Sequence, residues 1–323
     1  MSYFLTILRK IKFTINIKQY YINKHILLLI INIYLLYQNK LKENNSIDFD
    51  DMINKCTNLV NKDGNLPNWK YIIVDEYQDT SITKFNLINE IINKTNANFL
   101  AVGDDFQSIY RFTGCNLHIF LNFQKYFKNS KIFHIINTYR NPQELINIAG
   151  TFIMKNKQQL HKILISNKHI NNPIYLYETT DYIKTLKKIL NTIKENSIFV
   201  LGRNNNDITR YIDNTYKVED NYYTYNNITF KYLTIHSSKG LEADNIILIN
   251  MEDNILGFPS KIKDEKILKY VNNTKDYYKY EEERRLFYVA LTRTKNRVYI
   301  IAPKTNQSIF LKEIKKYTKK VNH

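Results

Sequence analysis

Short apolar runs alternate along the chain with longer segments of mixed polarity. The runs at 71–74, 99–102, 132–136, 198–201, 246–249 and 298–301 predict β-strands. They are apolar throughout instead of alternating, which is typical of strands covered on both faces. Helix-length segments lie between them, at 82–94, 143–157, 183–194 and 281–292. This alternation predicts an α/β fold with parallel sheets, which bind ligands where their strands end.

The ends of this pattern are less regular. Residues 3–45 predict helices with an unusually apolar surface. The apolar run at 26–37 contains Asn32 and is shorter than the roughly 20 residues of a membrane-spanning helix. We therefore expect a helix that is buried or faces a partner, and no membrane anchor. The stretches 203–227 and 259–280 are expected to be loops or insertions.

The composition is that of a soluble globular protein. The 323 residues, 44% hydrophobic and 24% charged, suffice for two domains. The formal net charge of +17 favours a polyanionic partner, with nucleic acid the usual one. A composition rich in Lys, Asn, Ile and Tyr is a second source of this charge. The two cysteines, Cys56 and Cys115, have no metal-type spacing and indicate a reducing compartment.

Two polar clusters follow the first predicted strands. Asp75 and Glu76 come directly after the strand at 71–74. A carboxylate there can hold Mg²⁺, and its neighbour can polarise an attacking water. Helix capping is the alternative, and it explains residues 79–81 but not the acidic pair. In the second cluster, 102–114, Gly103 permits a tight turn, and Tyr110 and Phe112 flank Arg111 as a platform for bases with a phosphate contact between them. Such aromatics also occur in ordinary cores.

Three further clusters contain candidate anion ligands. Arg140 is a candidate phosphate clamp, and Tyr139 beside it is a candidate stacking surface. The segment 233–242 has small hydroxyl residues and Gly240, which let a backbone approach an anion, although its Lys-Gly order is the reverse of a phosphate-binding loop. In 281–294 an apolar helical stripe ends in Arg293. The order of acids first and bases last in this segment is also explained by the helix dipole.

Taken together, these clusters resemble the UvrD/Rep-like superfamily 1 DNA helicases. The most specific motifs are Val-Asp-Glu-Tyr-Gln-Asp-Thr-Ser at 74–81 and Val-Ala-Leu-Thr-Arg at 289–293. The segment 101–114, the turn 257–259 and the short interval between Arg140 and Leu233 are most similar to bacterial helicase IV. The resemblance runs from about residue 37 to the C-terminus. It implies RecA-like (P-loop NTPase-type) parallel sheets: a helical 1B-like remnant at 1–66, the C-terminal part of a first RecA-like domain at 67–135, and a complete second one at 136–323 with a small insertion at about 150–230.

The resemblance also implies roles for individual residues. The nucleotide would be bound as its Mg²⁺ complex, with Asp75 on the metal and Glu76 activating the hydrolytic water. Gln107 would sense the γ-phosphate, Tyr139 would stack on adenine, and Gly240 and Glu242 would lie near the nucleotide. Arg140 and Arg293 would be arginine fingers. The residues expected near single-stranded DNA are Tyr110, Phe112 and His236, with Phe112 standing where many members have Trp.

One departure from the family concerns the phosphate-binding loop, Gly-x-x-x-x-Gly-Lys-Ser/Thr. No two glycines of the chain are five positions apart, so this motif is absent from the sequence. We expect the chain alone to bind ATP poorly and to hydrolyse little of it. Three explanations compete. The gene is split, with the loop on a separate polypeptide, or the gene copy is decayed or mis-started. In the third, the chain is a non-catalytic subunit that binds single-stranded DNA. Intact motor residues argue against long decay and favour a split or truncated helicase. The resemblance implies a cytoplasmic enzyme of 3′–5′ polarity that uses ATP with Mg²⁺ and works on single-stranded DNA and duplex junctions.

Overall fold

A computed structural model describes residues 17–63, 66–193, 197–262 and 278–321. The chain divides into two compact units, which are described separately. The first comprises 1–103, 112–120 and 263–275, and the second comprises 104–111, 121–262 and 276–323. The expected helix at 3–16 and residues 263–277 of an expected loop lie outside the described residues.

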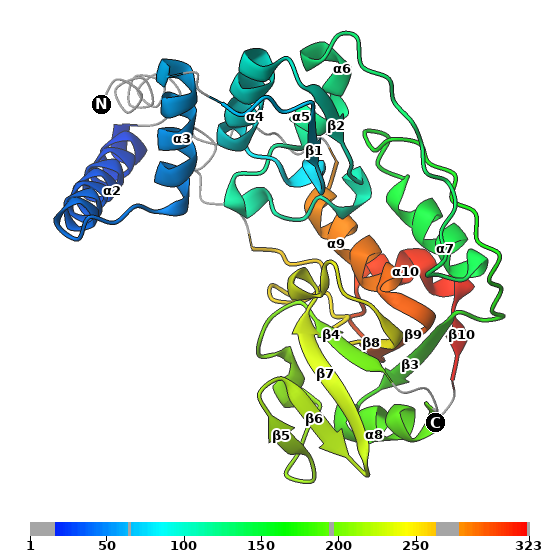
Figure 1. The fold of residues 1–323 in the computed structure, drawn as a ribbon. Helices are drawn as coiled ribbons and strands as arrows, with labels where there is room; N and C mark the ends of the chain where they lie inside the picture. Colours follow the sequence, from blue (N-terminus) through cyan, green and yellow to red (C-terminus); the bar gives the residue numbers. More distant parts are fainter. Residues whose placement is uncertain (1–16, 64–65, 194–196, 263–277, 322–323) are drawn as a thin grey trace. The chain divides into compact units, whose positions relative to one another are not determined.

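The first unit consists of helices and one small sheet (Figure 1). Strands β1 (Tyr71–Val74) and β2 (Asn98–Ala101) pair in parallel, with Val74 opposite Ala101. The helices are α2 (Ile17–Glu43), α3 (Phe49–Asp63) and α4 (Ile82–Thr95), and α5 (Leu117–Leu121) begins here. Ser81 caps α4 by accepting a hydrogen bond from the Lys84 amide. Both predicted strands and the helix at 82–94 are confirmed.

One face of this small sheet is open to solvent. Tyr71 is 70% exposed, Ile73 is 66% exposed, and Leu100 opposite Ile73 is 53% exposed. The expectation of strands covered on both faces is therefore wrong for the described residues, because side chains of alternate residues point to opposite faces and no described element covers one of these faces.

Helix α2 is exposed along most of its length. Within α2, Tyr20–Glu43 is long and apolar enough by length and composition to cross a membrane, with a mean hydropathy of 1.2 and with 11% of its most apolar 18 residues buried. Leu27 is buried, whereas Leu29 and Leu36 are 60% and 70% exposed. The expectation of a buried helix is wrong, and a partner-facing helix stays a prediction.

The second unit is built on an eight-stranded sheet with the order β10-β3-β9-β8-β4-β7-β6-β5. All neighbours are parallel except the β7-β6-β5 meander at one edge. The strands are β3 (Ile174–Thr179), β4 (Ile198–Gly202), β5 (Lys217–Glu219), β6 (Tyr222–Tyr225), β7 (Ile228–Thr234), β8 (Ala243–Leu248), β9 (Thr294–Pro303) and β10 (Lys319–Lys320). The helices are α6 (Phe123–Tyr126), α7 (Gln143–Ile153), α8 (Tyr182–Thr192), α9 (Glu281–Thr292) and α10 (Ile309–Ile314). The predicted α/β class with parallel sheets is confirmed.

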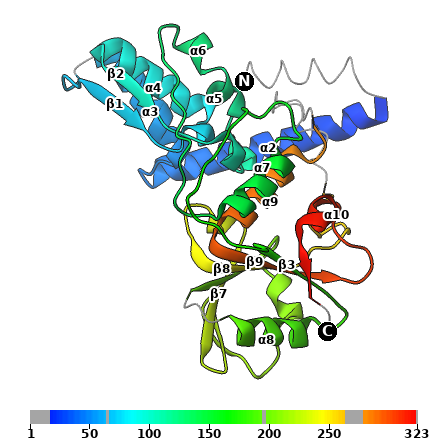
Figure 2. The ribbon, with the colours of Figure 1, turned by 90° about the vertical axis from the view of Figure 1, so that its right-hand side faces the viewer.

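Both faces of this sheet carry a hydrophobic core. Helices α7, α9 and α10 cover one face and α8 covers the other (Figure 2). In β8, Ile246 and Leu248 pack on the first side, and Ile247 packs on the second. All three are fully buried. The uninterrupted apolar sequence of this strand is thus explained by burial on two sides.

Two parts of the sequence prediction are wrong in this unit. Residues 132–136 form no strand, and Phe133 and Ile135 in this segment are 83% and 80% exposed. Its end bonds to a neighbouring segment, since Ile165 donates to the Ile136 carbonyl and accepts from Thr138. The stretch 203–227, expected to be loop, contains β5 and β6, and β3 and β7 were also not predicted.

The burial of β8 on both faces of the sheet leads to a prediction about the free energy of unfolding. Ile247→Ala is expected to lower the free energy of unfolding by about 2–5 kcal/mol, because it leaves a cavity in a close-packed interior. Ile163→Ala, at a position that is 65% exposed, is the matched control and should change it by less than about 0.5 kcal/mol. Urea unfolding followed by circular dichroism measures both. Equal effects of the two substitutions would contradict the described packing.

Candidate functional site

The predicted acidic pair lies at the carboxyl end of β1, in the first unit. Asp75 and Glu76 are both exposed. Glu76 has a left-handed backbone (φ 50°), its amide donates to Asp75 Oδ1 over 2.8 Å, and its Oε2 accepts from Gln78 Nε2 over 2.6 Å. A left-handed non-glycine residue costs free energy, and such residues concentrate at functional sites. The pair is thus held with defined orientation and remains open to solvent.

Gly103, which follows β2, has a packing role. A Cβ at this position would lie 2.5 Å from Gln78 Oε1 and 2.7 Å from the Phe120 ring. Any larger residue would displace Gln78, which holds the carboxylate of Glu76. The glycine is therefore explained by this close approach and not by the tight turn that we expected.

Gln107 lies in the second unit and contacts Arg293, which was predicted to be an arginine finger. Its Oε1 accepts a hydrogen bond from the terminal nitrogen Nη2 of Arg293 over 3.0 Å, and its Nε2 donates to Asp104 Oδ2 over 2.7 Å. Arg293 follows α9 directly, is 1% exposed, and also donates from Nε to the Val289 carbonyl. Sequence positions 107 and 293 are therefore brought into direct contact.

Other bonds hold the segment 104–111 to the rest of the second unit. Lys239 Nζ donates to the Gln107 carbonyl over 2.9 Å, and Arg285 Nε donates to the Ser108 carbonyl over 2.6 Å. The Arg111 guanidinium pairs with Glu282 over 3.2 Å. Arg111 was expected to contact a phosphate between two stacking rings, and in this structure its charge is instead neutralised by a carboxylate.

The acidic first turn of α9 has specific partners. Glu281 pairs with Arg285 over 2.9 Å, Glu282 pairs with Arg111, and Glu283 accepts bonds from the Arg203 guanidinium, the shortest 2.7 Å. Burial raises the pKa of Glu282, although the charge of Arg111 opposes this shift. The helix dipole alone therefore does not explain these acids, because Glu282 and Glu283 each bind an arginine of another segment, while Glu281 pairs with Arg285 within α9.

Arg140 and Glu242 form a second cluster of predicted nucleotide residues. Arg140 Nε donates to Glu242 Oε2 over 2.6 Å, and Lys295 lies 3.1 Å from the other carboxylate oxygen. The hydrogen bonds from Arg140 and Lys295 lower the pKa of Glu242. Beside them, Tyr139 is 87% exposed, so its ring is accessible for stacking. Gly240 has φ 81°, a conformation that favours glycine.

The residues predicted to lie near DNA are divided between the units. Tyr110 donates from its hydroxyl to the His236 carbonyl over 3.1 Å, and the two rings lie 6.5 Å apart. Lys239 lies over the Tyr110 ring at 5.0 Å. Burial, with a smaller effect of the Arg203 charge, lowers the pKa of His236 to about 4. Phe112 is 73% exposed and belongs to the first unit.

Sequence reasoning missed the residues that hold these side chains. Lys162, Lys239, Arg285 and Glu282 contact the segment 104–111 across long sequence separations. The charge pattern of 281–285 is a partial signal for the last two, and no local signal marks Lys162. Among the described residues no group of three or more His, Cys, Asp or Glu is arranged to hold a metal.

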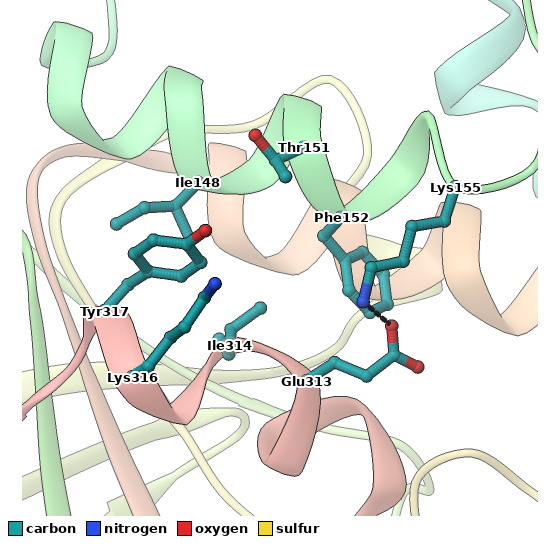
Figure 3. A pocket seen from close by; sticks show the side chains of 8 residues that line it. All are labelled: Ile148, Thr151, Phe152, Lys155, Glu313, Ile314, Lys316 and Tyr317. Carbon is teal, nitrogen blue, oxygen red and sulfur yellow. Dashed lines mark hydrogen bonds and ion pairs between the residues drawn. The ribbon is translucent and has the colours of Figure 1, made fainter.

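A small surface pocket lies between α7 and the C-terminal helices of the second unit (Figure 3). Its charged residues include Lys155 and Glu313, which pair over 2.6 Å. None of the predicted site residues lines it. We assign it no role.

Comparisons with known proteins agree with these motifs. The family model of the UvrD/REP helicase N-terminal domain matches residues 9–128, and that of the UvrD-like helicase C-terminal domain matches residues 219–305. DNA helicase IV of Escherichia coli K12 is 30% identical over 286 residues, which are 86% of this chain and 40% of that protein. The ATP-dependent DNA helicase Rep of Buchnera aphidicola subsp. Acyrthosiphon pisum is 34% identical over 51% of this chain and 27% of its own length.

The chain thus spans two fifths or less of the length of these relatives. Among solved structures, the PRRSV helicase matches with a TM-score of 0.39 and 14% identity, over 72% of this chain and 35% of that one. That likeness is too weak to add to the assignment, which rests on the two family models and the sequence matches. The chain belongs to the UvrD/Rep-like family of DNA helicases.

Proposed function

We propose that the chain is a motor segment of a 3′–5′ DNA helicase, which couples ATP hydrolysis to movement along single-stranded DNA. The observation that carries this proposal is the contact between Gln107 and Arg293. A buried guanidinium bonded to an amide links two segments that the family resemblance assigns to the nucleotide. Because Arg293 is 1% exposed, it acts in this conformation on Gln107, and Gln107 reports the γ-phosphate.

The residues of the chain are suited to ATP and Mg²⁺. Asp75 offers an exposed carboxylate, and Mg²⁺ in nucleotide sites commonly takes one or two carboxylates together with phosphates and waters. The metal, when bound with ATP, would neutralise phosphate charge. Glu76 would orient and polarise the attacking water. Tyr139 would stack on the base, near Gly240 and Glu242, and Arg140 would contact the phosphates with its terminal nitrogens while Glu242 holds its Nε.

Phosphate binding also needs a loop that these 323 residues do not contain. We propose that a segment outside this sequence supplies it, and that the chain alone turns over little ATP. The corresponding domains are a 1B-like helical region at 1–66, part of the first RecA-like domain at 67–135, and the second at 136–323. Tyr110, Phe112 and His236 would contact single-stranded DNA in a cytoplasmic protein.

A second candidate is a non-catalytic subunit that binds single-stranded DNA. The net charge of +17 favours it. Binding dominated by phosphate contacts would be indifferent to ATP and would weaken steeply as salt concentration rises. The motor proposal, in contrast, requires an affinity for DNA that changes with the bound nucleotide.

DNA-stimulated ATP hydrolysis distinguishes the two candidates. The chain is assayed alone, and then mixed with a separately produced family segment that carries the phosphate-binding loop. We expect activity in the mixture and little in either part. Glu76→Gln should lower kcat by on the order of 10²–10⁴-fold, because it removes the group that polarises water. If the mixture is inactive while the chain still binds DNA with an affinity that ATP does not change, the motor proposal fails. The proposal of a non-catalytic binding subunit then remains.

The lowered pKa of His236 leads to a prediction about how the stability of the protein depends on pH. The histidine binds a proton near pH 6.5 when unfolded and near pH 4 when folded, so unfolding takes up a proton between these values. Its contribution to stability, at most about 3 kcal/mol, is present above pH 6.5 and is lost as the pH falls to 4.

Replacement of this histidine tests the assignment. His236→Asn should flatten the loss of stability between pH 6.5 and pH 4, as measured by urea midpoints across that range. His134→Asn, at an exposed position, is the control and should leave the pH profile unchanged. A His236→Asn profile identical to that of the unmodified chain would show that the histidine titrates normally.

A further inference from the structure

Lys162 lies beside the candidate nucleotide residues in the second unit, at a position that no motif marks. It follows α7, and its side chain is 17% exposed. Its ammonium group pairs with Asp104 over 2.5 Å and with Asp105, and it lies 4.3 Å from the centre of the Phe106 ring. A lysine with this much burial is uncommon, and it needs such carboxylate partners.

The two neighbouring aspartates also need this cation. Asp105 is completely buried, and its Oδ2 accepts bonds from Gln159 Nε2 over 2.6 Å and from the Leu160 amide over 2.9 Å. Asp104 beside it is 30% exposed, and two adjacent carboxylates of which one is fully buried repel each other unless a positive charge lies between them. Burial alone would lower the pKa of Lys162, but the charges of Asp104 and Asp105 raise it above its ordinary value.

From Lys162 a continuous set of bonds leads to Gln107. Asp104 accepts from Lys162 and from the Phe106 amide with Oδ1, and from Gln107 Nε2 with Oδ2. The other end of the same amide accepts from Arg293. Because the nitrogen of the amide faces a carboxylate and its oxygen faces a guanidinium, its orientation is fixed. The position of Asp104 therefore decides where the Gln107 amide points.

We propose that Lys162 is a positioning residue, which holds the Gln107 amide in the orientation needed for hydrolysis by fixing Asp104. The inference rests on the proposed role of Gln107 at the γ-phosphate. Without the ammonium group, no cation lies between the adjacent carboxylates of Asp104 and Asp105, so they move apart and Asp104 no longer presents a fixed acceptor to Gln107. Misplacement of a group by about 1 Å can cost on the order of 10²-fold in rate.

The first test uses the chain mixed with the segment that carries the phosphate-binding loop. Lys162→Met should lower kcat for DNA-stimulated ATP hydrolysis roughly 10- to 100-fold, with KM for ATP changed less than about twofold. Lys162→Arg, which keeps the charge, should recover most of the rate. Lys155→Met is the matched control on the same side of the unit, because Lys155 pairs with Glu313 at the surface, and it should behave as the unmodified chain does.

A double-mutant cycle separates positioning from general destabilisation. In a Gln107→Ala background, Lys162→Met should cause no further loss of rate, because the group that it positions is gone. Equal losses in both backgrounds, or no rescue by Lys162→Arg, would overturn the proposal.

A second measurement needs no ATP hydrolysis. It therefore distinguishes a failure of the motor proposal from a failure of the proposed positioning role of Lys162. Hydrogen exchange of the chain alone reports on the segment 104–111, where the Phe106 amide bonds to Asp104 Oδ1. Lys162→Met should speed exchange in this segment by about tenfold or more, while β8 stays protected. Unchanged exchange would overturn the positioning role even if the mixture is inactive, and faster exchange with an inactive mixture would reject only the motor.

Discussion

Buried positive charge is the constraint on which the functional part of the second unit depends. Arg285, within α9, and Arg293, directly after α9, are 4% and 1% exposed. A buried guanidinium without partners would be very costly, so each must be given acceptors. Arg285 donates a hydrogen bond to the Ser108 carbonyl, and Arg293 donates one to the side-chain oxygen of Gln107. The segment 104–111 is therefore fixed against α9 by the need of these two cations for oxygen atoms.

The same segment is held from other directions. Lys239, from the segment before β8, bonds to the Gln107 carbonyl, and Lys162 neutralises Asp104 and Asp105. Removal of one partner leaves a buried charge on the other, which makes such networks more sensitive to substitution than surface ion pairs. The bonds hold Gln107, the proposed γ-phosphate sensor, in one orientation before any nucleotide binds.

The fold could be predicted in outline from the sequence. Continuous apolar runs identified β1, β2, β4, β8 and β9, and α9 was predicted with its observed ends. The failures have physical causes. The apolar run at 132–136 has the composition of a strand but no strand beside it, and composition does not supply a hydrogen-bonding neighbour. Strands β5 and β6, the last two at one side of the sheet, lie in polar, Asn-rich sequence, where half-exposed positions give no continuous apolar signal.

The sequence by itself determined the family, because the acidic pair Asp75 and Glu76 and the arginine Arg293 stand in motifs whose order and spacing are specific. It also determined the α/β class, because side-chain periodicity is a local property. Only the tertiary structure decided that Gln107 meets Arg293, that Arg111 is neutralised by Glu282, and that Lys162 lies between two aspartates. These contacts join residues 57 to 186 positions apart. Such pairings follow from how the core brings segments together, and no local pattern of residues encodes them.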